Sequence, residues 1–204
     1  MFSILRRLIW LKSIRKPLRV CIDPGHGWAC PHQAIGVTGT RESVVVLSVA
    51  EICVELARER GWQIELTRRT VMGNPKLSER VSIAEAFDAD CIVSIHCNWF
   101  SSPRANGYEV WCEDFVENRR LADAILDSAE LRLSNRNRGT KLVGINSPWD
   151  SRFPTILSST IPDVIVELGF LSNPEEEHQL NNTEFRRRWA EAIVGGVHEW
   201  SMSR

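Results

Sequence analysis

The chain has 204 residues, of which 43% are hydrophobic and 25% are charged, and its formal net charge is −1. This length suits one domain with a well-packed core and is short for two. The nearly balanced charge gives no general attraction to nucleic acid, and no apolar run approaches the roughly 18 residues that span a bilayer. We therefore expect one globular domain that binds no nucleic acid.

The N-terminal segment, residues 1–17, is the one compositionally biased stretch. It carries basic residues and no acidic residue. Only the short run LIWL separates Arg7 from Lys12, whereas a secretory signal needs about 7–15 consecutive apolar residues, so we expect no cleavable signal. Two interpretations stay open. The segment either forms a basic amphipathic helix on a membrane surface, or it is a lead-in that is poorly ordered or docks on the core.

Predicted strands and helices alternate along the rest of the chain, residues 18–204. Apolar runs indicate strands, and apolar residues at three- and four-residue spacing indicate helices. In chain order we expect a strand at 18–23, a helix at 42–60, a strand at 63–67, a helix at 77–87, strands at 91–95 and 107–111, a helix at 117–133, a short strand at 141–143 within a loop-rich stretch at 134–160, a strand at 164–168 and a helix at 183–201. This pattern predicts a single α/β domain with a mainly parallel, twisted sheet and helices on both faces.

The six cysteines indicate no disulfide framework. They contain no C-x-x-C pair, and Cys21, Cys53 and Cys91 lie in apolar runs, where a free cysteine behaves as a small hydrophobic residue. We therefore expect neither a cysteine zinc site nor disulfides, which fits folding in a reducing compartment.

Three polar residues interrupt the apolar pattern near the carboxyl ends of the predicted strands, where α/β sheets bind their ligands, and a fourth candidate begins a helix. His26 follows the first strand within PGHG, and His96 follows the run CIVSI. Glu42 begins the first helix, and Glu167 lies inside the apolar strand VIVEL. Two histidines and one carboxylate are a common catalytic zinc shell, and a second carboxylate could act as general base.

Each of these residues also has a simpler structural interpretation. A histidine at a strand end is often only hydrogen-bonded, and Glu42 could simply stabilise a helix N-terminus. Glu167 could form a buried ion pair with Arg68 or Arg80. Two further residues have open roles: Asp23 either hydrogen-bonds the His26 ring or shapes the turn, and Asn98 either holds its loop or contacts substrate. The four residues together favour a metal site.

The motifs DPGHG, TGTRES, SIHCN and VIVELGFLSNPEEEHQL occur in this order. In this they resemble the zinc-dependent N-acetylmuramoyl-L-alanine amidases of the amidase-3 type, over about residues 19–200. The resemblance implies that residues 18–204 are an amidase catalytic domain. It further implies that His26, Glu42 and His96 are the zinc ligands and that Glu167 is the catalytic glutamate. The substrate would be peptidoglycan, cleaved at the amide between N-acetylmuramic acid and L-alanine.

The chain departs from this family pattern at several positions near the proposed ligands. WACPH follows GHG where the family has a glycine and an acidic stretch. This introduces Cys30 and also His32, which could compete for the metal. Cys97 and Ser43 also replace the usual residue types. The chain is too short for the inhibitory helix that some members insert, so we expect an open site that needs no activator, with no wall-binding repeats after the domain.

Two rival functions remain open: a zinc peptidase that acts within the stem peptide, and a non-catalytic wall-binding domain. We expect a monomer. The absence of an evident signal slightly favours synthesis in the cytoplasm followed by release to the cell wall, as for a phage lysin, over export of a bacterial cell-separation or recycling enzyme.

Overall fold

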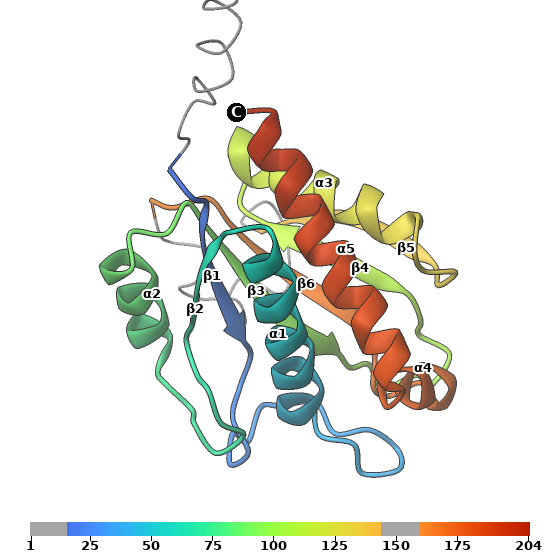
Figure 1. Cartoon of the computed structure of the whole chain (residues 1–204). Coiled ribbons are helices and arrows are strands. Elements are labelled where there is room, and N and C mark those ends of the chain that lie inside the picture. Colours follow the sequence, from blue (N-terminus) through green and yellow to red (C-terminus); the bar gives the residue numbers. More distant parts are fainter. Residues whose placement is uncertain (1–15, 144–159) are drawn as a thin grey trace, which may run out of the picture.

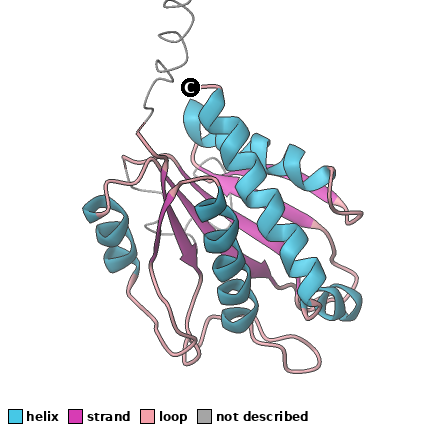
Figure 2. Ribbon diagram, viewed as in Figure 1, coloured by secondary structure: helices cyan, strands magenta, loops and turns pink. Residues whose placement is uncertain are grey.

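The apolar runs of the sequence form the strands of one six-stranded sheet (Figures 1 and 2). The structure is a computed structural model and describes residues 16–143 and 160–204. The strands are β1 (Arg19–Pro24), β2 (Gln63–Leu66), β3 (Cys91–Asn98), β4 (Tyr108–Cys112), β5 (Asn137–Leu142) and β6 (Asp163–Phe170). The helices are α1 (Glu42–Glu59), α2 (Leu77–Ala86), α3 (Val116–Glu130), α4 (Pro174–Leu180) and α5 (Thr183–Met202).

The strand order is β2-β1-β3-β6-β4-β5. The first four strands in this order run parallel to one another, β4 runs antiparallel to β6, and β5 runs parallel to β4. β3 and β6 are therefore central neighbours although they are far apart in the sequence. The predicted α/β class with a mainly parallel sheet is confirmed.

The two faces of the sheet have different surroundings. Side chains alternate between faces along each strand. Val20 and Ile22 of β1 belong to the main core, whereas Cys21 between them packs with Ile92 and with Ala84 of α2 in a small separate cluster. Helices α1, α3 and α5 lie together over the main core, while α2 lies toward the β1–β2 end of the sheet (Figure 1). Helices therefore occupy both faces, and the face opposite α1, α3 and α5 is less covered by described residues.

Helices α3 and α5 pack closely because α5 carries glycine at the contact. A Cβ added to Gly196 would lie 2.7 Å from the backbone nitrogen of Ile125 in α3, closer than real Cβ contacts occur. The aromatic side chains of Trp189 and Trp200 fill the core beside this contact. This helical layer packs against the strands that carry the polar residues on the opposite face.

Several element bounds differ from those predicted from sequence. β3 continues to Asn98 and β6 to Phe170, so His96 and Glu167 lie within strands instead of after them or at their end. β5 begins at Asn137, before the predicted segment 141–143, because pairing with β4 extends a polar strand that has no apolar pattern of its own. α4 is a separate short helix capped by Asn173.

Part of the predicted organisation lies outside the described residues, namely segment 1–15 and the loop at 144–159. Within the described residues, no helix combines the length and the apolar character needed to cross a membrane. All six cysteines are free, in agreement with the predicted lack of a disulfide framework.

Candidate metal centre

His26 lies two residues after the end of β1 and adopts an unusual backbone conformation. Its φ is +53°, in the left-handed region that residues other than glycine rarely occupy. The two flanking glycines permit close approach of the backbone to neighbouring groups: a Cβ on Gly25 would lie 2.6 Å from Nδ1 of His96, and one on Gly27 would lie 2.7 Å from Cβ of Asn74.

Glu42 is the first residue of α1, and its carboxylate is buried among hydrogen-bond donors. Oε2 accepts a hydrogen bond from the backbone nitrogen of Ala34 at 2.7 Å, and Oε1 accepts one from that of Cys97 at 2.9 Å. Oε1 also lies 2.9 Å from Nδ1 of His96. These bonds fix the carboxylate between the loop that follows β1 and the strand β3.

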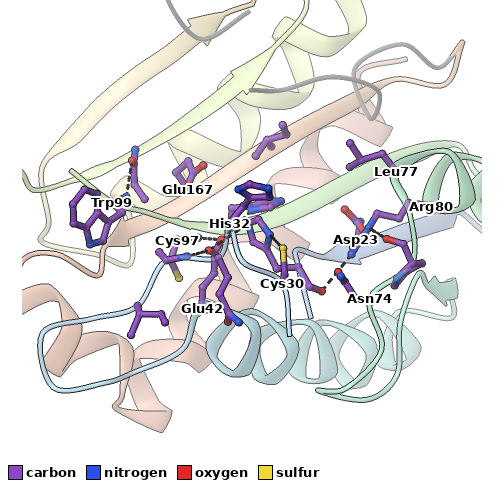
Figure 3. Close-up of a pocket in the computed structure, with 18 of the residues that line it drawn as sticks. Asp23, Cys30, His32, Glu42, Asn74, Leu77, Arg80, Cys97, Trp99 and Glu167 are labelled. Carbon is purple, nitrogen blue, oxygen red and sulfur yellow. Dashed lines mark hydrogen bonds and ion pairs between the residues drawn. The ribbon is translucent and has the colours of Figure 1, made fainter. Parts of the chain in front are cut away.

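His96 and Glu167 are neighbours across the centre of the sheet. They are paired residues in the parallel ladder of β3 and β6, so their side chains lie side by side on the same face. Ile92 of β3 and Ile165 of β6 point to this same face, and neither belongs to the main core. His96 and Glu167 therefore lie on the side of the sheet away from α1, α3 and α5. Figure 3 shows Glu167 and Glu42 in the same cleft.

His26, Glu42 and His96 bring one potential ligand atom each within 4.8 Å of one another. Nε2 of His26 lies 3.4 Å from Oε2 of Glu42, and the two imidazole rings meet edge to face with centroids 4.9 Å apart. Two imidazoles and one carboxylate are a donor set that suits a divalent metal of the zinc type and leaves a position for water. The described residues therefore fit a metal ion.

The protonation states of His26 and Glu42 favour metal binding, whereas a metal ion would have to displace a proton from His96. Burial lowers the pKa of His26 to about 4, so its imidazole is neutral near pH 7 and offers a lone pair. Burial alone would raise the pKa of Glu42, but the hydrogen bond and the charges of the two histidines outweigh it and lower the pKa. Burial alone would lower the pKa of His96, but the hydrogen bond and the charge of Glu42 outweigh this effect and raise the pKa.

Glu167 is held in the opposite electrostatic state. Burial raises its pKa to about 8; the charge of His96 opposes this shift, and the charges of Glu42 and Glu109 add to it. Its Oε2 atom is buried without a hydrogen-bond partner among the described residues. A buried oxygen of this kind is costly to a fold, and at a cleft it marks a group that takes its partner from a substrate or a water molecule.

Asp23 shapes the turn and does not hold the His26 ring. Its two oxygens accept hydrogen bonds from the side chains of Thr67, Ser94 and Arg80, the last two at 2.6 Å. Arg80 in turn donates to the carbonyl oxygen of His26 at 3.2 Å. The sequence left both roles open for Asp23, and these contacts support the turn.

The ion pair that the sequence allowed for Glu167 does not form in the described structure. Arg80 pairs with Asp23, and Arg68 donates hydrogen bonds to the backbone carbonyls of Pro24, Gly25 and Ser43. Both arginines therefore brace the loop that carries His26.

The proposed residues line a cleft of about 1150 Å³, which also contains Asn98, His32 and Trp99. Asn98 both accepts a hydrogen bond from the backbone nitrogen of Trp99 and donates one to Glu109 at 2.8 Å, so it holds its loop while lining the cleft. His32 lies in the cleft but is not part of the metal-binding group formed by the described residues.

Three residues near the site escaped the sequence interpretation. Glu109 of β4 is buried, and only its alternation with the core residues Tyr108 and Val110 could have placed it on the face of Glu167. Glu177 binds the loop before Glu42 through long-range contacts with no local sequence signal. Cys30 lies close to His26 because of a turn that the sequence alone did not reveal.

Comparison with known proteins shows the family to which the sequence is similar. The family described as N-acetylmuramoyl-L-alanine amidase (Amidase_3) matches residues 20–199. The amidase AmiA of Salmonella typhimurium is 29% identical, with 87% of this chain and 74% of the relative covered. AmiC of Neisseria meningitidis is 31% identical, and the match covers 91% of this chain but only 53% of that longer protein.

A solved structure shows the same architecture. The N-acetylmuramoyl-L-alanine amidase AmiC2 of Nostoc punctiforme superposes with a TM-score of 0.81 at 31% sequence identity. The superposition covers 92% of this chain and 98% of that one. The likeness of the backbone therefore extends over nearly the whole of both chains.

Proposed function

The chain belongs to the N-acetylmuramoyl-L-alanine amidase family of cell-wall hydrolases, and we propose that its cleft performs this hydrolysis with a zinc ion held by His26, Glu42 and His96. The substrate bond is the amide between the lactyl group of N-acetylmuramic acid and the L-alanine of the stem peptide. The observation that carries the proposal is the convergence of these three ligand residues beside Glu167, whose buried Oε2 has no partner in the described structure.

His26 and Glu42 are already in the charge states that bind a metal ion. His26 and His96 would bind through ring nitrogens, and the ionised Glu42 would supply negative charge. A zinc ion held by these residues would supply Lewis acidity to the amide carbonyl, would lower the pKa of an attacking water, and would favour the ionised form of the adjacent Glu167. Asp23, Arg68 and Arg80 keep the His26 loop in place, so little reorganisation precedes binding.

Glu167 moves the proton in this reaction. Its free Oε2 takes a proton from the water as the water attacks the amide carbonyl, and the same oxygen then gives the proton to the departing alanine nitrogen. The causes that raise its pKa favour the second half of this transfer, since burial and the charges of Glu42 and Glu109 make the protonated carboxyl stable until the leaving group takes the proton.

The test is digestion of purified peptidoglycan by the zinc-loaded protein, with the products identified by mass spectrometry. We expect stem peptides with new L-alanine amino termini, loss of this product after chelation, and its return when zinc is restored. A matched pair of variants tests the base: Glu167→Gln should bind zinc but lose nearly all turnover, whereas Glu175→Gln on the exposed surface of α4 should behave as wild type.

Three outcomes would contradict the proposal. Cleavage within the stem peptide would assign the metal site to a peptidase, and zinc binding without any cleavage would indicate a binding domain. Full activity of Glu167→Gln would remove Glu167 from the role of general base.

Other predictions concern the setting of the enzyme. We propose that it is a monomer, that residues 1–17 form a lead-in outside the catalytic domain at 18–204, and that it is made in the cytoplasm and released to the wall. Contact of the basic N-terminal segment with a membrane stays a prediction that co-sedimentation with anionic vesicles would test, using a variant that lacks residues 1–15 as the control.

A further inference from the structure

We propose that the sulfur of Cys30 positions the His26 ring for metal binding, by accepting a hydrogen bond from its Nδ1–H group. Sγ of Cys30 lies 3.1 Å from Nδ1 of His26, and Figure 3 shows Cys30 in the cleft with Glu42. This inference rests on the proposed function, because it concerns the zinc ligand His26.

The two nitrogens of the His26 ring face different partners. Nε2 lies 3.4 Å from Oε2 of Glu42, which belongs to the metal-binding group. Nδ1 points to Cys30. A neutral imidazole carries one proton, so a hydrogen bond from Nδ1–H to sulfur leaves the Nε2 lone pair free for the metal. Cys30 thereby selects the tautomer that can bind.

Cys30 takes the place of the usual hydrogen-bond partner for the second ring nitrogen of a metal-binding histidine. Such histidines usually donate their second N–H group to a carboxylate, a backbone carbonyl or a water molecule. Asp23 is the nearest carboxylate in sequence, but its oxygens are taken by Thr67, Ser94 and Arg80. Arg80 also binds the carbonyl oxygen of His26, which fixes the peptide but leaves the ring free to rotate. The contact with Cys30 fixes the ring.

The loop between His26 and Cys30 is rigid enough for this role. The backbone nitrogen of Cys30 donates to the carbonyl of Gly27 at 3.0 Å, which closes a tight turn. The buried Gln33 side chain donates to the carbonyls of Gly27 and Trp28, while its own oxygen accepts a hydrogen bond from the Ser43 hydroxyl beside Glu42. The turn that carries the sulfur is thus tied to the start of α1.

Cys30 acts as a neighbour of the ligand and not as a ligand itself. The metal-binding group formed by the described residues contains His26, Glu42 and His96 without Cys30. Its sulfur lies at the ring nitrogen directed away from that group. Replacement of Cys30 should therefore weaken metal binding without removing it, whereas replacement of His26 should abolish the site.

The test measures zinc affinity of the full chain by competition with a chromophoric chelator. Loss of a hydrogen-bond partner to a metal ligand typically costs about 10–100-fold in affinity, and we expect a loss of this size for Cys30→Ala. Cys30→Ser should recover part of it, since a hydroxyl oxygen can accept the same bond. Cys53→Ala is the matched control, because Cys53 is buried in α1 beside Ala190 of α5, and its zinc affinity should equal that of wild type.

Two further readouts separate positioning from other roles. The unfolding midpoint of chelated Cys30→Ala should stay close to that of chelated wild type, because only the metal-binding geometry is affected. Cobalt-substituted wild type should show d–d bands without a thiolate-to-cobalt charge-transfer band.

Several results would overturn the inference. Equal zinc affinity of Cys30→Ala and wild type would show that the sulfur does not position the ring. A thiolate charge-transfer band would make Cys30 a direct ligand. Failure of the proposed function gives a different result: wild type and His26→Ala would then bind zinc equally or not at all, which overturns the metal site and the inference with it.

Discussion

Glu109 of β4 and Glu167 of β6 are paired residues across the antiparallel ladder, yet their carboxylates have opposite surroundings. Glu109 accepts hydrogen bonds from Asn98, Trp111 and Arg138, and Arg138 forms an ion pair with it at 2.7 Å. Oε2 of Glu167 has no partner in the described part of the chain. Glu109 is thus held in place by its neighbours while its charge acts on Glu167.

The first prediction concerns this pair of carboxylates. Burial is the main cause of the raised pKa of Glu167, and the charge of Glu109 adds to it. Glu109→Gln removes that charge, so the pKa of Glu167 should fall. A general base acts when ionised, and the acid limb of the profile of kcat/KM against pH should therefore move to lower pH. Glu175→Gln, an exposed change, should leave the limb in place; an unmoved limb in Glu109→Gln would contradict the prediction.

Three of the four central site residues could be selected from sequence because each interrupts a local apolar pattern, whereas Glu42 only begins a helix. His26 and His96 follow apolar runs, and Glu167 is an acid inside one. The parallel sheet could be predicted for a similar reason, since strands buried on both faces are apolar without alternation. Each of these signals is contained within about ten residues of the chain.

The partners of the site residues could not be predicted, because they depend on which distant segments the fold brings together. The strand order places β6 beside β3, and only then does Glu167 lie next to His96. The sequence allowed Asp23 to hydrogen-bond the His26 ring. In the structure its oxygens instead accept hydrogen bonds from Thr67 and Arg80, which come from other parts of the fold. The reversed direction of β4 likewise leaves no trace in its own sequence.

Glu167→Gln should stabilise the chelated protein toward alkaline pH. The pKa of Glu167 is raised from its ordinary value of 4.5 to about 8 in the folded state. Between these values the unfolded chain ionises this group while the folded protein keeps it protonated, so wild-type stability falls as pH rises, by at most about 1.4 kcal/mol per pH unit. Glutamine cannot ionise. The difference in unfolding free energy between variant and wild type should grow from pH 4.5 to 8 and then level off, and a constant difference would refute this.

Glu177 should control the metal site from a distance. Its carboxylate accepts hydrogen bonds from the backbone nitrogen and hydroxyl of Thr38 and from the backbone nitrogen of Thr40, in the loop that leads to Glu42. Glu177→Ala leaves these donors without a partner, which should cost about 1–3 kcal/mol of unfolding free energy and weaken zinc binding. The neighbouring Glu175→Ala is the control, since Glu175 is exposed, and denaturant unfolding and zinc titration of both variants give the comparison. Equal zinc affinity in the two variants would show that the loop does not depend on Glu177.

Gly25→Ala should abolish metal binding. The added Cβ would lie 2.6 Å from Nδ1 of His96 and closer still to other atoms of the ring, so either the ring or the loop after β1 must move. Because His96 is bonded to Glu42, displacement of its ring would break the metal-binding group. Gly39→Ala provides a contrast: a Cβ there has nothing within 4 Å, although its φ of +93° adds backbone strain. Zinc titration should therefore show binding for Gly39→Ala but not for Gly25→Ala, and binding by both would contradict the predicted clash.

The ion pair of Asp23 and Arg80 should make the fold sensitive to acid. Burial alone would raise the pKa of Asp23, but the charge of Arg80 and the hydrogen bonds of Ser94 and Thr67 outweigh it and lower the pKa below its ordinary value of 3.8. A carboxyl with a lowered folded pKa contributes stability above its unfolded pKa and loses it as pH falls through the folded one. Asp23→Asn leaves Arg80 buried without its charge partner and should cost about 3–5 kcal/mol near pH 7. Unfolding measured from pH 7 down to pH 2 should show the gap between wild type and Asp23→Asn closing below about pH 4, because wild type then loses the same interaction; a gap that stays constant would mean that the ion pair is not what stabilises the loop of His26.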